Sequence, residues 1–97
     1  MNTVCLEKKA KIFKALGHPT RLKIVHLLLK EELCVCRLLV QMQGEANGST
    51  LSRHLAILRD AGVLESRKKG QSVYYRLKLS CVANFLECLT TKDCECA

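Results

Sequence analysis

The spacing of apolar residues changes along the chain and divides it into five predicted helices and one hairpin. In most of the sequence apolar side chains recur every three or four positions, which is typical of helices with one buried face. Between residues 63 and 77 they alternate with polar side chains, which is typical of strands. The pattern predicts helices over residues 5–16, from residue 19, and over about 34–42, 50–60 and 80–90, with a β-hairpin over 63–77.

Glycine, proline and hydroxyl residues indicate where these elements begin and end. We expect Gly17 to end the first helix as a left-handed cap, and Pro19 to occupy the first turn of the second helix, where its missing N–H costs nothing. A side-chain oxygen of Ser49 or Thr50 is expected to cap the fourth helix. Gly62 is expected to end that helix.

Two helices carry a clear apolar stripe that predicts their buried face. In the second helix the stripe is Leu22, Val25, Leu28 and Leu29, with Arg21, Lys23 and Lys30 lying away from it. In the fourth helix the stripe is Leu51, Leu55 and Leu58. The helical wheel then turns Ser49, Thr50, Arg53, Ala56 and Ile57 outward and leaves Ser52 and His54 on the flanks.

The hairpin carries a basic connection between its strands. VLESR and SVYYRL flank the four residues KKGQ, and alternation places Val73, Tyr75 and Leu77 on one face of the second strand. Residues 49–78 contain seven Lys or Arg against two acidic residues, within a net charge of +7 for the whole chain. A basic block is often only a solvated surface, so the arrangement of the charges has to decide its role.

The order of the elements predicts an α+β, mostly helical fold, a winged helix-turn-helix. A polar-faced helix can enter the DNA major groove, where hydroxyl and guanidinium groups contact base edges, and a basic hairpin can neutralise phosphates. The predicted DNA contacts are Ser49, Thr50, Ser52, Arg53, His54, Arg67, Lys68 and Lys69. An ordinary capped surface helix is the alternative for residues 50–60, and a packed, hydrogen-bonded side chain is the alternative for His54.

Length and hydropathy limit the organisation of the chain. We expect one DNA-binding and dimerisation domain over residues 1–92 and a flexible, cysteine-containing tail over residues 93–97. A monomer of this size buries only about 60–65% of its unfolded surface, which favours a homodimer with a shared core. No apolar run reaches about 18 residues and the first residues lack the apolar segment of a signal peptide, so we expect a cytoplasmic protein without a membrane partner.

The chain contains seven cysteines, at positions 5, 34, 36, 81, 88, 94 and 96. In a reducing compartment this number indicates metal binding or thiol chemistry rather than a disulfide framework. Some of them, Cys81 above all, could instead be small buried apolar residues. No redox Cys-x-x-Cys pair, phosphate loop or paired carboxylates indicate an enzyme.

Several motifs in the same order resemble the ArsR/SmtB family of dimeric winged-helix metalloregulatory repressors. They are IFKALGHPTRLKIVHLL, ELCVC and STLSRHLAILRDAGVLESRKKGQSVYYRL, together spanning about residues 12–77. The resemblance implies a homodimer, built largely from the first and last helices, that represses an operator until an effector binds.

ELCVC is similar to the metal box of arsenic- and cadmium-responsive members, which implies that Cys34 and Cys36 are effector ligands. Arsenic boxes often continue to a third cysteine, but here Arg37 to Leu39 follow, so a third donor must come from elsewhere. Cys5 is one candidate, as in members whose N-terminal cysteines reach the same box. A second candidate site is formed by Cys88, Cys94 and Cys96.

Soft thiolates favour soft or borderline ions such as As(III), Sb(III), Cd(II), Pb(II) or Zn(II), and the resemblance implies As(III) or Sb(III) as the effector. Residues two apart point about 200° apart around a helix. We therefore expect that capture by Cys34 and Cys36 unwinds the first turn of the third helix and displaces the neighbouring recognition helix. The competing hypotheses are a redox- or persulfide-sensing repressor of the same fold and a thiol-rich metal-buffering protein.

Overall fold

The computed structural model of the chain describes residues 3–44 and 47–89. Within these ranges the elements are α1 (Thr3–Leu16), α2 (Pro19–Leu28), β1 (Leu33–Cys34), α3 (Val35–Gln41), α4 (Gly48–Asp60), β2 (Leu64–Lys69), β3 (Ser72–Leu77) and α5 (Cys81–Leu89). All five predicted helices and the hairpin are therefore confirmed. The predicted tail, with Cys94 and Cys96, lies outside the described residues.

The three strands form one antiparallel sheet in the order β1-β3-β2. The hairpin is tighter than predicted, because β2 and β3 pair up to Lys69 and Ser72 and leave only Gly70 and Gln71 as the turn. Gly70 has a positive φ of 65°, which suits a two-residue hairpin turn. The basic residues that were expected in the connection consequently lie in β2.

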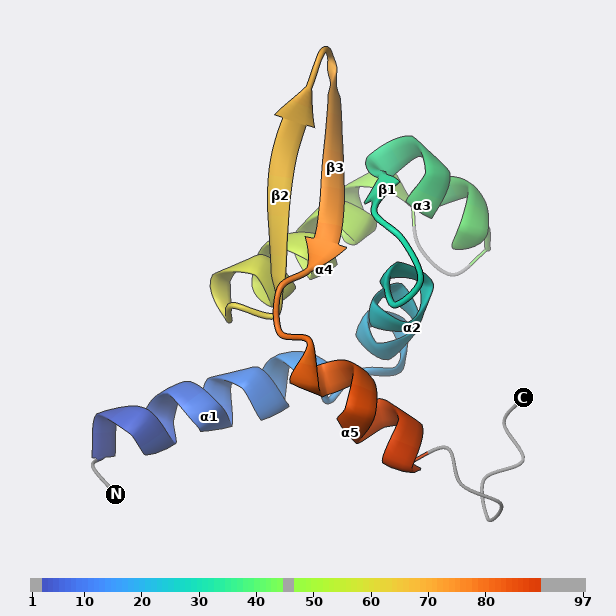
Figure 1. Cartoon of the computed structure of the whole chain (residues 1–97). Helices are drawn as coiled ribbons and strands as arrows, with labels where there is room; N and C mark the ends of the chain where they lie inside the picture. Colours follow the sequence, from blue (N-terminus) through green and yellow to red (C-terminus); the bar gives the residue numbers. More distant parts are fainter. Residues whose placement is uncertain (1–2, 45–46, 90–97) are drawn as a thin grey trace.

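The core forms where α2, α4 and the inner face of the sheet meet. Leu51, Leu55 and Leu58 of α4 are buried, as their spacing predicts. The stripe predicted for α2 was only partly right, because Ile24 is fully buried beside Val25 while Leu22 and Leu29 are half-buried. The hairpin extends away from this core, and α1 and α5 lie at the opposite end of the molecule (Figure 1).

Two predicted helix boundaries were wrong in detail. α1 ends at Leu16 as expected, but Gly17 is not left-handed, since the described residues with positive φ are Gly44, Gly62 and Gly70. The cap of α4 is Asn47, whose side-chain oxygen accepts the backbone N–H of Thr50 at 2.9 Å. α4 therefore begins at Gly48 and carries Ser49 and Thr50 inside its first turn.

The predictions for Pro19 and Gly62 were confirmed. Pro19 is the first residue of α2, and the Nδ1 atom of His18 caps that helix by accepting the N–H of Thr20 at 3.1 Å. Gly62 follows α4 with a φ of 86°, a conformation that favours glycine.

Replacing Asn47 tests the revised start of α4. We expect Asn47→Ala to lower the free energy of unfolding by about 1 kcal/mol, because the first turn loses its side-chain acceptor. Ser49→Ala, the matched control, should change it by less than about 0.5 kcal/mol. Urea unfolding followed by circular dichroism measures both, and a larger loss for Ser49→Ala would show that the cap is misassigned.

Candidate nucleic-acid interface and thiol site

The first two turns of α4 present polar side chains on the face opposite its leucines. Ser49, Thr50, Ser52 and Arg53 are all exposed, and the first turn contains no acidic residue. Ala56 and Ile57, which were predicted to face outward, are half-buried. The surface that α4 can offer to DNA is therefore concentrated at its N-terminal half, where the helix dipole also favours an anion.

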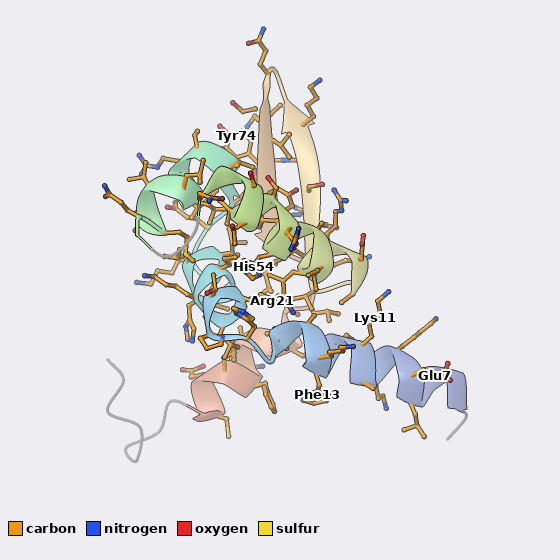
Figure 2. The ribbon with its side chains drawn as sticks, turned by 180° about the vertical axis from the view of Figure 1, so that it is seen from behind. Glu7, Lys11, Phe13, Arg21, His54 and Tyr74 are labelled. Carbon is orange, nitrogen blue, oxygen red and sulfur yellow. The ribbon has the colours of Figure 1, made fainter. Side chains whose placement is uncertain are left out.

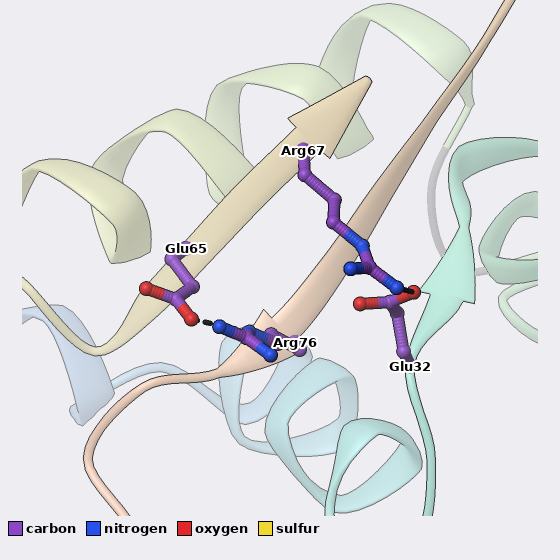
Figure 3. Close-up of polar contacts among 4 residues, drawn as sticks. All are labelled: Glu32, Glu65, Arg67 and Arg76. Atoms are coloured by element: carbon purple, nitrogen blue, oxygen red, sulfur yellow. Dashed lines mark hydrogen bonds and ion pairs between the residues drawn. The ribbon is translucent and has the colours of Figure 1, made fainter. Parts of the chain in front are cut away.

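The hairpin of β2 and β3 is the wing of this fold, and its basic residues differ in their surroundings. Arg67, Lys68 and Lys69 are exposed along β2. The Nη2 atom of Arg67 donates to Oε1 of Glu32 at 2.9 Å, across the sheet (Figure 3). Lys68 and Lys69 have no carboxylate partner in the part of the chain that the structure describes. A phosphate could therefore reach these two wing cations without displacing a carboxylate, although the Lys69 ammonium lies 5.8 Å from the centroid of the Tyr74 ring.

A second ion pair lies on the same face of the sheet. Glu65 and Arg76 stand opposite each other in the β2–β3 register, and the guanidinium donates to the carboxylate (Figure 3). Together with Glu32 and Arg67, these residues form alternating charges across the face. This surface is close to electrically balanced, unlike the exposed end of β2.

His54 lies inside the domain, with 8% of its surface exposed. Its Nδ1 atom accepts a hydrogen bond from Nε of Arg21 at 3.1 Å, and the two side chains meet between α2 and α4 (Figure 2). Its ring centroid is 4.8 Å from that of His18. The packed alternative for His54 is therefore favoured over the base contact. Arg21, which was predicted to lie away from the apolar stripe of α2, is half-buried on the side of that helix that faces α4.

The surroundings of His54 keep its ring neutral. Burial lowers the pKa of His54 below 6.5, and the neighbouring His18, Arg21 and Arg53 lower it further. A neutral ring can accept at Nδ1, whereas a protonated ring has no acceptor for Arg21. The contact that ties α2 to α4 thus depends on the unprotonated form.

Cys34 and Cys36 lie beside each other rather than on opposite faces of a helix. Their Sγ atoms are 2.8 Å apart. Cys34 belongs to β1 and has extended backbone angles of φ −81° and ψ 161°, so α3 begins only after it. The prediction that these thiols need an unwound helix was therefore wrong, because one of them precedes the helix.

The two thiols influence each other's protonation. The hydrogen bond from Cys36 lowers the pKa of Cys34, and the backbone N–H of Arg37 lowers it further. The same interaction raises the pKa of Cys36. The pair therefore favours a thiolate at Cys34 that shares the proton of Cys36, a state suited to bind a soft electrophile.

No third donor completes this pair within the described part of one protomer. No group of three or more Cys, His, Asp or Glu residues there could hold a metal ion. Cys5 is an exposed residue in the first turns of α1, and that end of α1 lies far from β1 and α3 (Figure 1). Cys88 is exposed on α5, whereas Cys94 and Cys96 are outside the described residues. Within one protomer the described residues do not bring Cys5 to Cys34 and Cys36, and the predicted set of Cys88, Cys94 and Cys96 lies partly outside the described residues.

Residues 18–66, just over half of the 97, match the family described as bacterial regulatory protein, arsR family. The chain belongs to the ArsR family. A family of regulatory proteins agrees with the expectation that this chain is not an enzyme. No helix among the described residues is long and apolar enough to span a membrane.

Curated relatives include regulators of metal resistance. The arsenic resistance transcriptional regulator ArsR1 of Pseudomonas putida is 49% identical over 67 residues, which cover 68% of this chain and 51% of that protein. The cadmium resistance regulatory protein CadC homolog of Staphylococcus aureus is 46% identical over 69 residues, covering 70% of this chain and 55% of that protein. The ArsR family chain thus spans about half the length of these relatives.

The architecture agrees with this family. A possible ArsR-family regulator of Mycobacterium bovis, solved as a homodimeric winged helix-turn-helix DNA-binding domain, superposes with a TM-score of 0.81. It is 30% identical, and the match covers 91% of this chain and 80% of that one. The predicted fold, a winged helix-turn-helix, is thereby confirmed.

The pH dependence of stability tests the buried state of His54. Because the unfolded chain takes up the His54 proton at higher pH than the folded chain, the free energy of unfolding should fall as the pH falls below 6.5. His54→Gln should reduce this loss, while His26→Gln, at an exposed position of α2, should retain it. Thermal unfolding between about pH 8 and pH 5 measures the effect. Equal pH dependence in wild type and His54→Gln would contradict the assignment.

Proposed function

We propose that this ArsR family chain is a homodimeric, DNA-binding transcriptional repressor of the cytoplasm that leaves its operator when a thiophilic ion binds Cys34 and Cys36. As(III) or Sb(III) is the proposed effector, with Cd(II), Pb(II) or Zn(II) as further candidates. The observation that supports this most strongly is the 2.8 Å approach of the two Sγ atoms, next to a sheet that ends in the basic wing.

The proposed DNA surface combines the start of α4 with the end of β2. Exposed Ser49, Thr50, Ser52 and Arg53 would lie in the major groove. Lys68 and Lys69, with Arg67 in part, would contact phosphates. His54 is left out of this contact set, because the domain encloses it and Arg21 occupies its Nδ1 atom.

Apolar surface on α1 and α5 supports the homodimer. Leu6, Phe13 and Phe85 are large apolar residues that remain exposed in the single chain. The rings of Phe13 and Phe85 contact edge to face, with centroids 5.8 Å apart, and Phe13 projects from α1 (Figure 2). A second copy would cover this surface and set two α4 helices about 34–36 Å apart along an operator.

The third ligand is proposed to come from outside the pair. Cys5 of the second protomer is the first candidate, since Cys5 of the same chain lies at the far end of α1. The set of Cys88, Cys94 and Cys96 is the second candidate, acting as a separate site.

The strand β1 supports a direct route from the thiols to the wing. Cys34 pairs with Tyr74 of β3, and Tyr74 pairs with Arg67 of β2. α3 packs on β1 and β3. Ligation that moves Cys34 would therefore shift the wing, and a coupling of about 1–3 kcal/mol would weaken DNA binding 5- to 150-fold.

A salt titration of operator binding tests the wing. We expect Lys68→Ala and Lys69→Ala each to reduce the slope of log affinity against log salt by about 1, because each removes one phosphate contact. Arg67→Ala should change it less, since Glu32 already neutralises that side chain. Lys11→Ala on α1 (Figure 2) is the control. Identical slopes for the Lys68, Lys69 and Lys11 variants would refute a role for the wing.

Serine variants test the effector site. Cys34→Ser and Cys36→Ser should bind operator normally but lose release by arsenite, measured as fluorescence anisotropy under reducing conditions, because neither retains two thiolates. Wild type should weaken about 5- to 150-fold. Cys5→Ser and the Cys94→Ser/Cys96→Ser pair then assign the third ligand. Release of the Cys34 and Cys36 variants at wild-type arsenite concentrations would exclude this site.

A redox switch is the second candidate function, favoured by the same short distance between the thiols. Peroxide or polysulfide would convert Cys34 and Cys36 to a disulfide or persulfide, with the oxidant taking up the electrons. Release of operator by peroxide in the presence of a chelator, but not by arsenite, would favour it over ion binding.

A further inference from the structure

Arg21 connects the helix that is proposed to read DNA to a helix that is proposed to form the dimer. From α2, its Nε atom donates to Nδ1 of His54 in α4 at 3.1 Å. Its Nη1 atom donates to the backbone oxygen of Ala15 in α1 at 3.4 Å. Arg21 is half-buried, whereas Ala15 and His54 are buried. One side chain therefore joins α1, α2 and α4, and its contact with His54 lies between the last two of these helices (Figure 2).

The leucine stripe of α4 and the contacts of Arg21 constrain different properties of that helix. Burial of the leucines decides which face of α4 points outward, but apolar contacts have no direction. A hydrogen bond requires a distance and an angle within narrow limits. The two contacts of Arg21 can therefore set the tilt of α4 relative to α1, and with it the separation of the two α4 helices in the proposed dimer.

The groups that face His54 are all basic. The ring centroid of His18 lies 4.8 Å from that of His54, and Arg21 and Arg53 are the other two charged neighbours. Burial lowers the pKa of His54, and these three neighbours lower it further. If the ring were protonated, the N–H at Nδ1 would oppose the N–H of Arg21, and two positive charges would meet.

The acidic residues of the elements that pack around His54 do not offset this charge. α2 contains no acidic residue. Asp60 of α4 is the last residue of that helix, about 9 Å beyond His54 at 1.5 Å per residue. Glu7 lies in the first half of α1, and Glu65 of β2 follows buried Leu64, so it points to the other face of the sheet. A protonated His54 would therefore have no carboxylate to replace its contact with Arg21.

We propose that Arg21 and His54 are positioning residues for operator binding, which hold α4 at the angle to α1 that two successive major grooves require and release it when His54 takes up a proton. The inference rests on the proposed repressor function. Neither residue has to touch DNA, because both act through the position of Ser49 to Arg53 in the first turns of α4.

The expected pH dependence is opposite in sign to that of general electrostatics. Protonated histidines add positive charge, so attraction to phosphates alone tightens DNA binding as the pH falls. If neutral His54 holds α4 in place, affinity is highest above 6.5 and falls as the pH drops through the lowered pKa of His54. The sign of the slope therefore separates positioning by His54 from a general gain of charge.

The experiment measures fluorescence anisotropy of a duplex that the wild-type chain has selected from random-sequence DNA. Titrations run between about pH 7.5 and about pH 5.5 at constant ionic strength. Circular dichroism at each pH restricts the comparison to folded protein. We expect wild-type affinity to fall about tenfold over this range, a size typical of coupling between two sites.

Variants assign the effect to the hydrogen bond. His54→Leu removes the acceptor and should weaken binding about tenfold at about pH 7.5. His54→Gln, whose amide oxygen can accept from Arg21, should recover most of that loss and should not respond to acid. His26→Gln, at an exposed position of α2, and His18→Asn, which keeps a helix-capping oxygen, should both retain the acid response.

A double-mutant cycle and a change of operator spacing separate positioning from simple loss of stability. Arg21→Gln should weaken binding about as much as His54→Leu, and the double variant should be no weaker than either. A duplex with one base pair inserted between its half-sites should bind wild type much more weakly than the selected duplex. His54→Leu should discriminate less between the two duplexes, whereas a chain that is only less stable would lose affinity for both equally.

The outcomes distinguish this inference from the proposed function. Wild-type binding that tightens or stays constant as the pH falls, or an acid response that survives in His54→Gln, would overturn the positioning role and leave the repressor function standing. Additive losses in the double variant would also overturn it. A wild-type chain that selects no duplex would refute the repressor function, and the inference with it.

Discussion

The burial of one face of α4 is the interaction on which the rest of the molecule depends. Leu51, Leu55 and Leu58 are all at most 1% exposed, and each fully buried leucine contributes about 1.5–3 kcal/mol relative to an exposed one. Fixing this face leaves α4 no rotational freedom. The polar side chains of its first turns must then point outward, and Arg21 and Asn47 only refine a position that the leucines determine.

Much of this arrangement could be predicted from the sequence, since it follows from local periodicity. The leucine stripe of α4 and the alternation of β3 repeat over enough residues to reveal their period. β1 could not be predicted in this way, because Leu33 and Cys34 are too few to show alternation. Because Cys34 lies in this strand and not in α3, missing the strand also led to the wrong prediction for the geometry of the two thiols.

Contacts between residues far apart in the chain could not be predicted from local patterns either. Arg21 and His54 are 33 positions apart, and Glu32 and Arg67 are 35 apart. A wheel of α2 places Arg21 on the same face as the buried Ile24 and Val25, but nothing near Arg21 in the sequence indicates the acceptor that it meets there. The cap of α4 was misplaced for a simpler reason: Asn47, Ser49 and Thr50 are all good caps, and residue type alone does not select among them.

The ion pair between Glu32 and Arg67 gives the wing an internal anion. In the proposed complex a DNA phosphate has to displace the Glu32 carboxylate, which lies 2.9 Å from the Arg67 guanidinium. Anion replaces anion, so the net Coulomb gain is small, and the carboxylate remains nearby to recapture Arg67 when the phosphate leaves. Glu32 also directly precedes β1. The segment that carries Cys34 therefore also carries a carboxylate that competes with DNA for Arg67.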